Sequence, residues 1–271
     1  MRTLRAALGI ALGSASALPA SAQIAGEHTP AAGARPAEVP FQVGEQLTYD
    51  LKFGVLKVGT GRMRVLGQED VRGQLAWHVR FSVSGGTFFY KVNDVYESWM
   101  DVMTLNSLRY EQDLSQGSRD RERRFEIFPE RATYRETTRN PEELPSVSQP
   151  LDDGSFLFFV RTLPLEIGQT YTFHRYFRPD RNPVIIRVLR RERIRVPAGE
   201  FDAIVIQPII KTSGIFAEGG QAEIWLADDA SRMMLQMKTR LSFGSLNLYL
   251  RSFRHSAVTT EVGTVVPDST P

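Results

Sequence analysis

Apolar and polar residues alternate one for one along most of this chain. In residues 45–53 the apolar side chains fall on one face and the polar ones on the other, and residues 75–84 repeat the pattern. Successive side chains of a β-strand point to opposite sides, so this period is typical of strands with one buried face. Long helical patterns do not alternate with these segments, which disfavours a parallel sheet. The sequence therefore predicts a mainly β protein, a strongly curved antiparallel sheet or open β-barrel of roughly a dozen strands.

The expected strands are separated by Gly, Pro and polar turns. They cover 45–53, 55–66, 75–84, 94–101, 107–114, 121–128, 131–137, 170–177, 184–196, 202–211, 221–227, 233–243 and 245–254, with a short strand at 87–90. Residues 68–73 are expected to form a polar turn, and 141–150 a loop bounded by Pro.

One segment has helical spacing instead. Asp152 or Asp153 can cap a helix over residues 152–163, and Pro164 ends it. The apolar residues at helical spacing are Phe156, Leu157, Phe159, Val160 and Leu163. A short helix this apolar needs burial along one side, most simply against the open face or mouth of the curved sheet. We expect it to act as a structural plug.

The first 22 residues have the three regions of a secretory signal peptide. Arg2 and Arg5 precede an apolar stretch over 6–18, and Ala20-Ser21-Ala22 is a cleavage motif, with the predicted cut after Ala22. An uncleaved anchor is the alternative, but Gly and Ser interrupt the apolar run well short of the roughly 20 residues that span a bilayer. The sequence thus predicts a periplasmic or secreted protein that does not span the membrane.

Composition then divides the chain into four parts. The predicted organisation is a signal peptide at 1–22, a flexible leader rich in Ala, Gly and Pro at 23–40, a single β-rich domain at 41–255, and a disordered tail at 256–271. The chain has no Cys, which excludes disulfides, thiolate metal sites and Cys nucleophiles. The exported domain must therefore be stabilised by its core.

The formal charge disfavours nucleic acid as a partner. Arg2 and Arg5 account for two of the 33 Lys and Arg residues, which leaves 31 against 31 Asp and Glu in the mature chain. Binding to polyanions by counterion release needs a clear positive surplus on one face.

Three passages resemble a bacterial family known as domain of unknown function 3108. The first is Phe41 to Tyr49 with Val58-Gly59-Thr60, and the second is Asp152 to Gly168. The third runs from Val196 to Ala203, through Ile224 to Asp229, to Leu241 to Leu246. The resemblance covers about residues 41–254. It implies an exported β-rich protein with no assigned activity, and so no catalytic residues to carry over.

The residues that usually carry chemistry form no local motif. Asp152-Asp153 and Asp228-Asp229 are adjacent pairs, which usually point apart and are expected to cap the helix and shape a hairpin. The four histidines, His28, His78, His174 and His255, are far apart and include no zinc motif. We expect His78 and His174 to face solvent. No serine elbow or dinucleotide motif is present, so the sequence predicts no catalytic residue, metal or cofactor.

Arg191, Arg193 and Arg195 fall on one face of an expected strand. One interpretation is a solvated face paired with acidic residues of a neighbouring strand such as 121–128. The other is a patch that binds the anionic head groups of lipid or lipopolysaccharide.

Aromatic residues give a second candidate site. The chain has 16 Phe, 8 Tyr and 3 Trp. Phe88, Phe89 and Tyr90 place rings on both faces of a short strand, and Trp99 and Trp225 lie in other strands. Ordinary core packing is one interpretation. The other is that these five residues line a cavity for an acyl chain or other apolar ligand.

Two classes of function remain open at this point. The leading hypothesis is an exported, non-enzymatic envelope protein that binds a hydrophobic or amphiphilic ligand or a cell-envelope protein. The alternative is a hydrolase of envelope lipids or polymers whose site is not visible in the sequence, which predicts a solvent-open cleft where acidic, His or Ser groups converge.

Overall fold

A computed structural model describes residues 36–86, 91–210, 222–241 and 244–254 of the chain. Fourteen strands in this part form one antiparallel sheet in the order β8-β7-β6-β5-β4-β3-β2-β1-β14-β13-β12-β11-β10-β9. The strands are β1 (Gln46–Phe53), β2 (Leu56–Val71), β3 (Gln74–Gly86), β4 (Lys91–Asp101), β5 (Ser107–Gln116), β6 (Arg119–Phe128), β7 (Thr133–Glu136), β8 (Asn140–Pro145), β9 (Thr170–Phe173), β10 (Val184–Val196), β11 (Gly199–Ile209), β12 (Glu223–Ala227), β13 (Met234–Leu241) and β14 (Gly244–Arg254). The predicted mainly β, antiparallel fold is confirmed.

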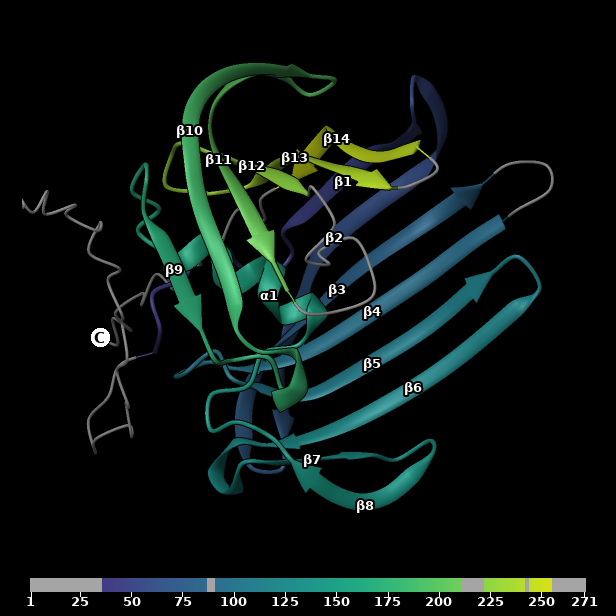
Figure 1. Cartoon of the computed structure of the whole chain (residues 1–271), viewed down its shortest axis with the longest axis vertical. Coiled ribbons are helices and arrows are strands. Elements are labelled where there is room, and N and C mark those ends of the chain that lie inside the picture. The colour runs from purple at the N-terminus through teal and green to yellow at the C-terminus, as the bar shows by residue number, and fades with distance from the viewer. Residues whose placement is uncertain (1–35, 87–90, 211–221, 242–243, 255–271) are drawn as a thin grey trace, which may run out of the picture.

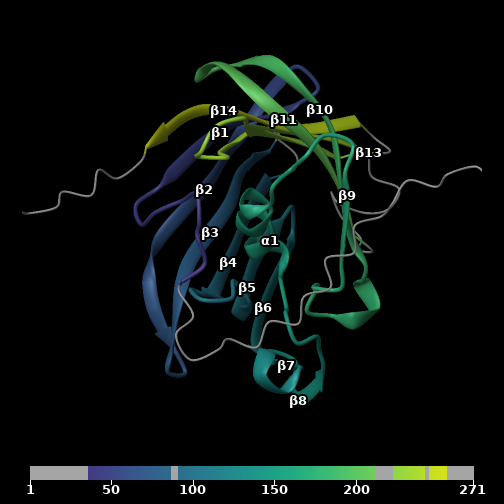
Figure 2. The ribbon, with the colours of Figure 1, turned by 90° about the vertical axis from the view of Figure 1, so that its left-hand side faces the viewer.

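The sheet curves around a single α-helix of the described chain, α1 (Asp153–Phe159), which continues as a 3-10 turn, η2 (Val160–Thr162). Two further 3-10 turns, η1 (Pro129–Arg131) and η3 (Pro179–Arg181), lie outside the sheet. Figures 1 and 2 show β3 to β6 on one side of α1 and β9 to β11 on the other. The helix is therefore enclosed by the concave face, as its apolar residues predict.

Consecutive strands pair with each other, except β8 and β9, which are the two edges of the sheet. The first and last strands of the chain, β1 and β14, also pair, and this ladder joins one half of the sheet (β1 to β8) to the other (β9 to β14). The chain crosses from one free edge, β8, to the other, β9, through α1. This crossing places the helix inside the curve.

The segment between β8 and α1 bridges the two edges of the sheet. Ser146 Oγ donates a hydrogen bond to the Phe177 carbonyl at 2.7 Å, and the Phe177 amide donates to the Leu151 carbonyl at 2.9 Å. The Ser107 amide at the start of β5 donates to the Pro150 carbonyl at 2.8 Å. The sheet is not closed, because its two edge strands are not paired with each other, and the connecting segment lies between them.

Three local expectations were wrong in their bounds. The expected loop at 141–150 contains β8, because an edge strand tolerates the prolines that a central strand excludes. The strand expected at 170–177 ends at Phe173, where the chain turns toward α1. The polar stretch 68–73 is mostly strand, because β2 continues to Val71 and only Arg72-Gly73, both with positive φ, form the turn.

Candidate functional site

Strands β2, β3 and β4 end together at a pocket of about 350 Å³. Its lining residues are Val58, Ser84, Gly85, Gly86, Lys91, Val92 and Asn93. A pocket of this size falls at the small end of the range for ligand sites. The pocket lies at the end of the sheet where β1 ends and β2 begins, and where β3 ends and β4 begins (Figure 1).

Two paired glycines bring the backbones together beside this pocket. Gly59 pairs with Gly85 across β2 and β3. A Cβ on Gly59 would lie 2.4 Å from the Ser84 carbonyl oxygen, and a Cβ on Gly85 would lie 2.3 Å from the Val58 carbonyl oxygen. Neither position can hold a side chain without separating the strands, so the pocket presents bare backbone there.

The chemistry of the lining is mixed. Val58 supplies an apolar side chain, Lys91 an exposed ammonium, and Ser84 and Asn93 polar groups. The side chain of Val92 points to the opposite face of β4 from Lys91 and Asn93. Apolar walls with a few convergent polar groups are typical of small-molecule sites. This set suits an amphiphile whose head group is anionic.

The predicted ligand residues Phe88, Phe89 and Tyr90 lie outside the described residues. In sequence they occupy 87–90, directly between Gly86 and Lys91 of the pocket lining. The sequence prediction and the pocket therefore point to the same part of the chain, and the role of these three aromatic residues stays a prediction.

The two predicted tryptophans lie away from this pocket. Ser98 points toward α1, where its hydroxyl donates to Asp152, so the next residue, Trp99, points to the opposite face. The Trp99 indole N–H donates to Glu69 at 2.8 Å. The Trp225 indole N–H donates to Glu192 at 2.6 Å, with the Lys238 ammonium 5.0 Å from its ring. Each indole thus has polar and charged neighbours, and the structure does not bring the two together.

The prediction that His78 faces solvent was wrong. Its side chain is buried, with its ring stacked on Trp99 at 4.2 Å. Nδ1 lies 2.7 Å from Glu69 and Nε2 lies 2.8 Å from Glu97. Burial works against the charged imidazolium, but the hydrogen bonds to Glu97 and Glu69 outweigh it, so the pKa of His78 is raised. His174, in contrast, is exposed.

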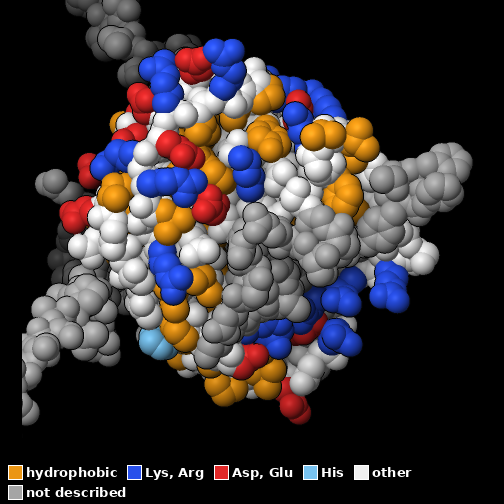
Figure 3. Space-filling model, turned by 45° about the horizontal axis from the view of Figure 1, so that its top comes forward, with side chains coloured by type: hydrophobic (Ala, Val, Ile, Leu, Met, Phe, Trp, Pro, Cys, Tyr) orange, Lys and Arg blue, Asp and Glu red, His pale blue; other side chains and the backbone are white. Residues whose placement is uncertain are grey.

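The three arginines of the predicted basic patch have acidic neighbours, but not on 121–128 as expected. Arg191 pairs with Asp228 at 2.7 Å, and both Arg193 and Arg195 pair with Glu200. The partners differ because β10 lies beside β11, on the far half of the sheet from β6. Over the upper left of the face in Figure 3, blue and red side chains likewise lie side by side. Binding of anionic head groups at this patch stays a prediction.

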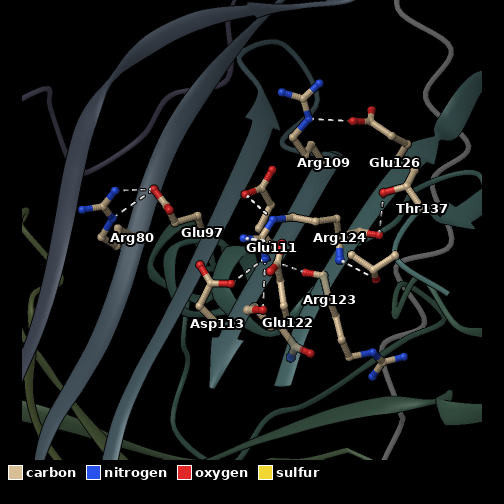
Figure 4. A network of polar contacts seen from close by, with 12 residues as sticks. Arg80, Glu97, Arg109, Glu111, Asp113, Glu122, Arg123, Arg124, Glu126 and Thr137 are labelled. Carbon is tan, nitrogen blue, oxygen red and sulfur yellow. Dashed lines mark hydrogen bonds and ion pairs between the residues drawn. The ribbon is translucent and has the colours of Figure 1, made fainter. Parts of the chain in front are cut away.

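Charge pairing also covers the face of β3 to β6 that points away from α1. Arg124 contacts Glu111, Asp113 and Glu122 at 3.0, 2.7 and 3.2 Å (Figure 4). Arg109 pairs with Glu126 at 2.7 Å. Cross-strand pairs of opposite charge stabilise a sheet, which gives this network a structural role.

Both adjacent aspartate pairs have the structural roles expected of them. Asp152 caps α1 by accepting hydrogen bonds from the Gly154 and Ser155 amides, both at 2.8 Å. Asp229 accepts from the Ser231 amide at 2.9 Å in the turn after β12. Asp228 pairs with arginines. Neither pair converges across a cleft.

The cap of α1 belongs to a buried polar cluster. Ser98 Oγ donates to Asp152 Oδ1 at 2.6 Å, and Ser107 and Ser155 share a hydrogen bond of 2.8 Å. On the other side, the Tyr110 hydroxyl donates to Asp153 at 2.9 Å. Asp152 and the three serines are almost fully buried, so a substrate has no access to this cluster.

Burial makes the Asp152 carboxyl a weaker acid than an exposed aspartate. Desolvation raises the pKa of its carboxyl to about 6, against the hydrogen bonds from Ser98 and Ser155. The folded protein therefore keeps this proton at pH values where the unfolded chain has lost it. Its contribution to stability is largest below pH 4 and is lost as pH rises through about 6.

We expect Asp152→Asn to remove this pH dependence. Asparagine caps helices as well as aspartate does, and Asp152 Oδ2 has no hydrogen-bond partner to lose. A shift of about two pKa units corresponds to ~3 kcal/mol. Between pH 4 and pH 7.5 the variant should gain roughly 1–3 kcal/mol relative to the wild type, measured by urea unfolding. Parallel pH curves for the two proteins would contradict this account.

A fully buried ion pair was missed by the sequence analysis. Arg161 in η2 donates to Glu45 through two nitrogens, at 2.7 and 3.0 Å. The same guanidinium donates to the carbonyls of Pro40 at 3.2 Å and Ser231 at 2.9 Å. The pair joins the segment before β1, the helix and the β12–β13 turn. The one charged residue within an apolar helical run was the signal for it.

Comparison with known proteins can now be placed beside this geometry. The family described as "Protein of unknown function (DUF3108)" matches residues 48–251. The chain belongs to the DUF3108 family. The resemblance inferred from the three sequence passages is thereby confirmed. In the structure, Glu45 of the first passage and Arg161 of the second form the buried ion pair. Arg161 also donates to the carbonyl of Ser231, in the turn that follows Asp229 of the third passage.

A solved structure supports the fold of this DUF3108 protein. The chain is similar to a β-barrel-like protein of domain of unknown function DUF1849 from Brucella abortus, with a TM-score of 0.55 and 11% identity, covering 81% of this chain and 100% of that one. A hypothetical protein from Chlamydia trachomatis gives a TM-score of 0.38 at 9% identity, covering 81% of this chain and 90% of that one. No curated protein matches the sequence.

Two negative findings apply to the described part of the DUF3108 chain. No group of three or more His, Cys, Asp or Glu side chains there could hold a metal ion. None of the helices there is long and apolar enough to cross a membrane.

Proposed function

We propose that this DUF3108 protein is an exported, non-enzymatic protein of the cell envelope that binds one amphiphilic ligand with an anionic head group. The pocket at the end of β2 to β4 is the observation that carries the proposal. Val58 contacts the apolar part, and Lys91 pairs with the head group.

The location of the pocket supports an amphiphile over a wholly buried lipid. The concave face near α1 is occupied by side chains: Phe158 packs edge-on against Phe41 at 5.3 Å, and Phe159 against Phe173 at 5.5 Å. At these two contacts, aromatic rings occupy the space beside the helix. A ligand at the end of the strands keeps its head group in water while its apolar part is covered.

Native mass spectrometry of the protein purified from the exported fraction tests the proposal. We expect a co-purifying amphiphile in the wild type and its loss in Lys91→Glu, which reverses the charge, and in Val58→Trp, which places an indole in the pocket. The matched control is Arg193→Glu, an equivalent charge reversal at an exposed cation of the β10 patch.

The outcomes separate the two candidate sites. Retention of the ligand in Arg193→Glu and its loss in Lys91→Glu supports the pocket. The opposite result would move the site to the arginine patch, and a wild-type protein that carries no ligand would overturn the proposal. Circular dichroism of each variant shows whether the fold is kept.

A further inference from the structure

The turn between β1 and β2 presents an apolar apex to solvent. Val55 is 89% exposed, Leu56 68% and Phe53 38%. Gly54 has a φ of +58°, as in the first central position of a type II′ hairpin turn. Turns of this kind usually carry polar residues such as Asn, Asp or Ser, whereas Val55 and Leu56 here hold most of their apolar surface in water.

Cations lie directly below this apex. Lys52 and Lys57 are opposite each other on the paired strands. Lys57 Nζ lies 2.7 Å from Asp50, and Arg251 Nε lies 3.7 Å from the same carboxylate oxygen. Lys57 and Arg251 thus share one carboxylate, and Lys52 adds a third cation, so three cations against one carboxylate leave two positive charges in excess. The Lys52 ammonium lies 5.0 Å from the Tyr249 ring.

The order of these groups along the hairpin matches the layers of a lipid surface. An apolar end enters the boundary of the acyl chains, and Lys ammonium groups one residue below it reach the anionic head groups. We propose that the β1–β2 turn is a contact with an anionic phospholipid membrane.

The place of the turn in the sheet agrees with this role. In Figure 1 it stands at the periphery, away from α1. Leu56 begins β2, and Val58 of the same strand lines the pocket described above. A protein held at the membrane by this turn presents its pocket near the lipid surface. The contact does not require the pocket to bind a ligand, and the two proposals fail separately.

Vesicle binding of the exported protein tests the contact. The vesicles are phosphatidylcholine with about one quarter phosphatidylglycerol, and phosphatidylcholine alone for comparison. We expect binding to the anionic vesicles, a loss of affinity of at least about tenfold in Val55→Ser/Leu56→Ser, and weakening by about 0.5 M NaCl. The matched control is Leu75→Ser, which alters an apolar residue of 49% exposure in β3, beside the β2–β3 turn at the other end of the strands.

A second readout places the turn at the membrane directly. Because the chain has no Cys, Val55→Cys and Leu75→Cys each create a unique site for an environment-sensitive fluorophore. Anionic vesicles should shift the emission to shorter wavelength at residue 55 and leave it unchanged at residue 75.

Three results would overturn the contact. They are no binding by the wild type, equal binding by Val55→Ser/Leu56→Ser, and equal emission shifts at residues 55 and 75. Loss of a co-purifying protein in the double variant, with vesicle binding unchanged, would assign the turn to a protein partner instead. Retention of the pocket ligand in the double variant would show that the pocket is independent of the turn.

Discussion

Arg161→Met is expected to lower the free energy of unfolding by about 3–5 kcal/mol, because it leaves the buried Glu45 carboxylate without its counter-charge. Arg161 is 1% exposed and Glu45 2%. The guanidinium also satisfies the carbonyls of Pro40 and Ser231, which lose a donor in the variant. Urea unfolding at pH 7, followed by circular dichroism, measures the change.

Two further variants separate the buried charge from lost packing. Glu45→Leu/Arg161→Met leaves no buried charge, and we expect it to be more stable than Arg161→Met alone. Arg195→Met breaks an exposed pair with Glu200 and should cost about 1 kcal/mol or less. If Arg161→Met costs no more than Arg195→Met, then this pair does not hold the three segments together.

The alternation of apolar and polar residues was sufficient to predict the sheet, because a curved sheet around a core buries one face of nearly every strand. It failed where another force decides. β8 carries Pro141, Glu142, Glu143 and Pro145, a composition typical of loops, and forms a strand only because β7 lies beside it at the edge. The pairing is a property of the β7–β8 hairpin that the composition of residues 140–145 does not reveal.

The same pattern assigns a residue to a face without saying what covers that face. His78 does lie on the polar side of β3, as predicted. It is nevertheless buried, because Trp99 of β4 stacks on it and two glutamates flank it. The prediction of solvent exposure assumed that a polar face is a bare one.

The candidate site was only partly accessible from sequence. Phe88, Phe89 and Tyr90 adjoin the pocket lining in sequence, and their role stays a prediction. The close approach of Gly59 to Gly85 beside the pocket joins residues far apart in sequence, which no local pattern indicates. Arg161 and Glu45 both lie in passages that carry the family resemblance. Only the fold shows that they touch.

Phe177→Ala is expected to have an effect as large as Arg161→Met, about 3–5 kcal/mol. Phe177 is 1% exposed and follows β9, yet its ring packs against rings of the opposite half of the sheet. The ring centroids lie 5.2 Å from Phe125, 5.2 Å from Tyr134 and 6.1 Å from Tyr110. Truncation leaves a cavity where the two edges of the barrel meet.

The position of this cavity predicts where the loss of stability is felt. The Phe177 amide donates to the Leu151 carbonyl, and the Phe177 carbonyl accepts from Ser146. The segment 146–151, here called the seam, and the edge strand β8 should therefore open first. Hydrogen exchange measured by mass spectrometry is expected to rise at 140–151 and 174–178 and to stay low in β1, β2 and β14. Phe253→Ala, at a ring 43% exposed, is the matched control and should cost about 1 kcal/mol or less. A uniform rise in exchange across the sheet would mean that the barrel unfolds as one unit and that the seam is no weaker than the paired strands.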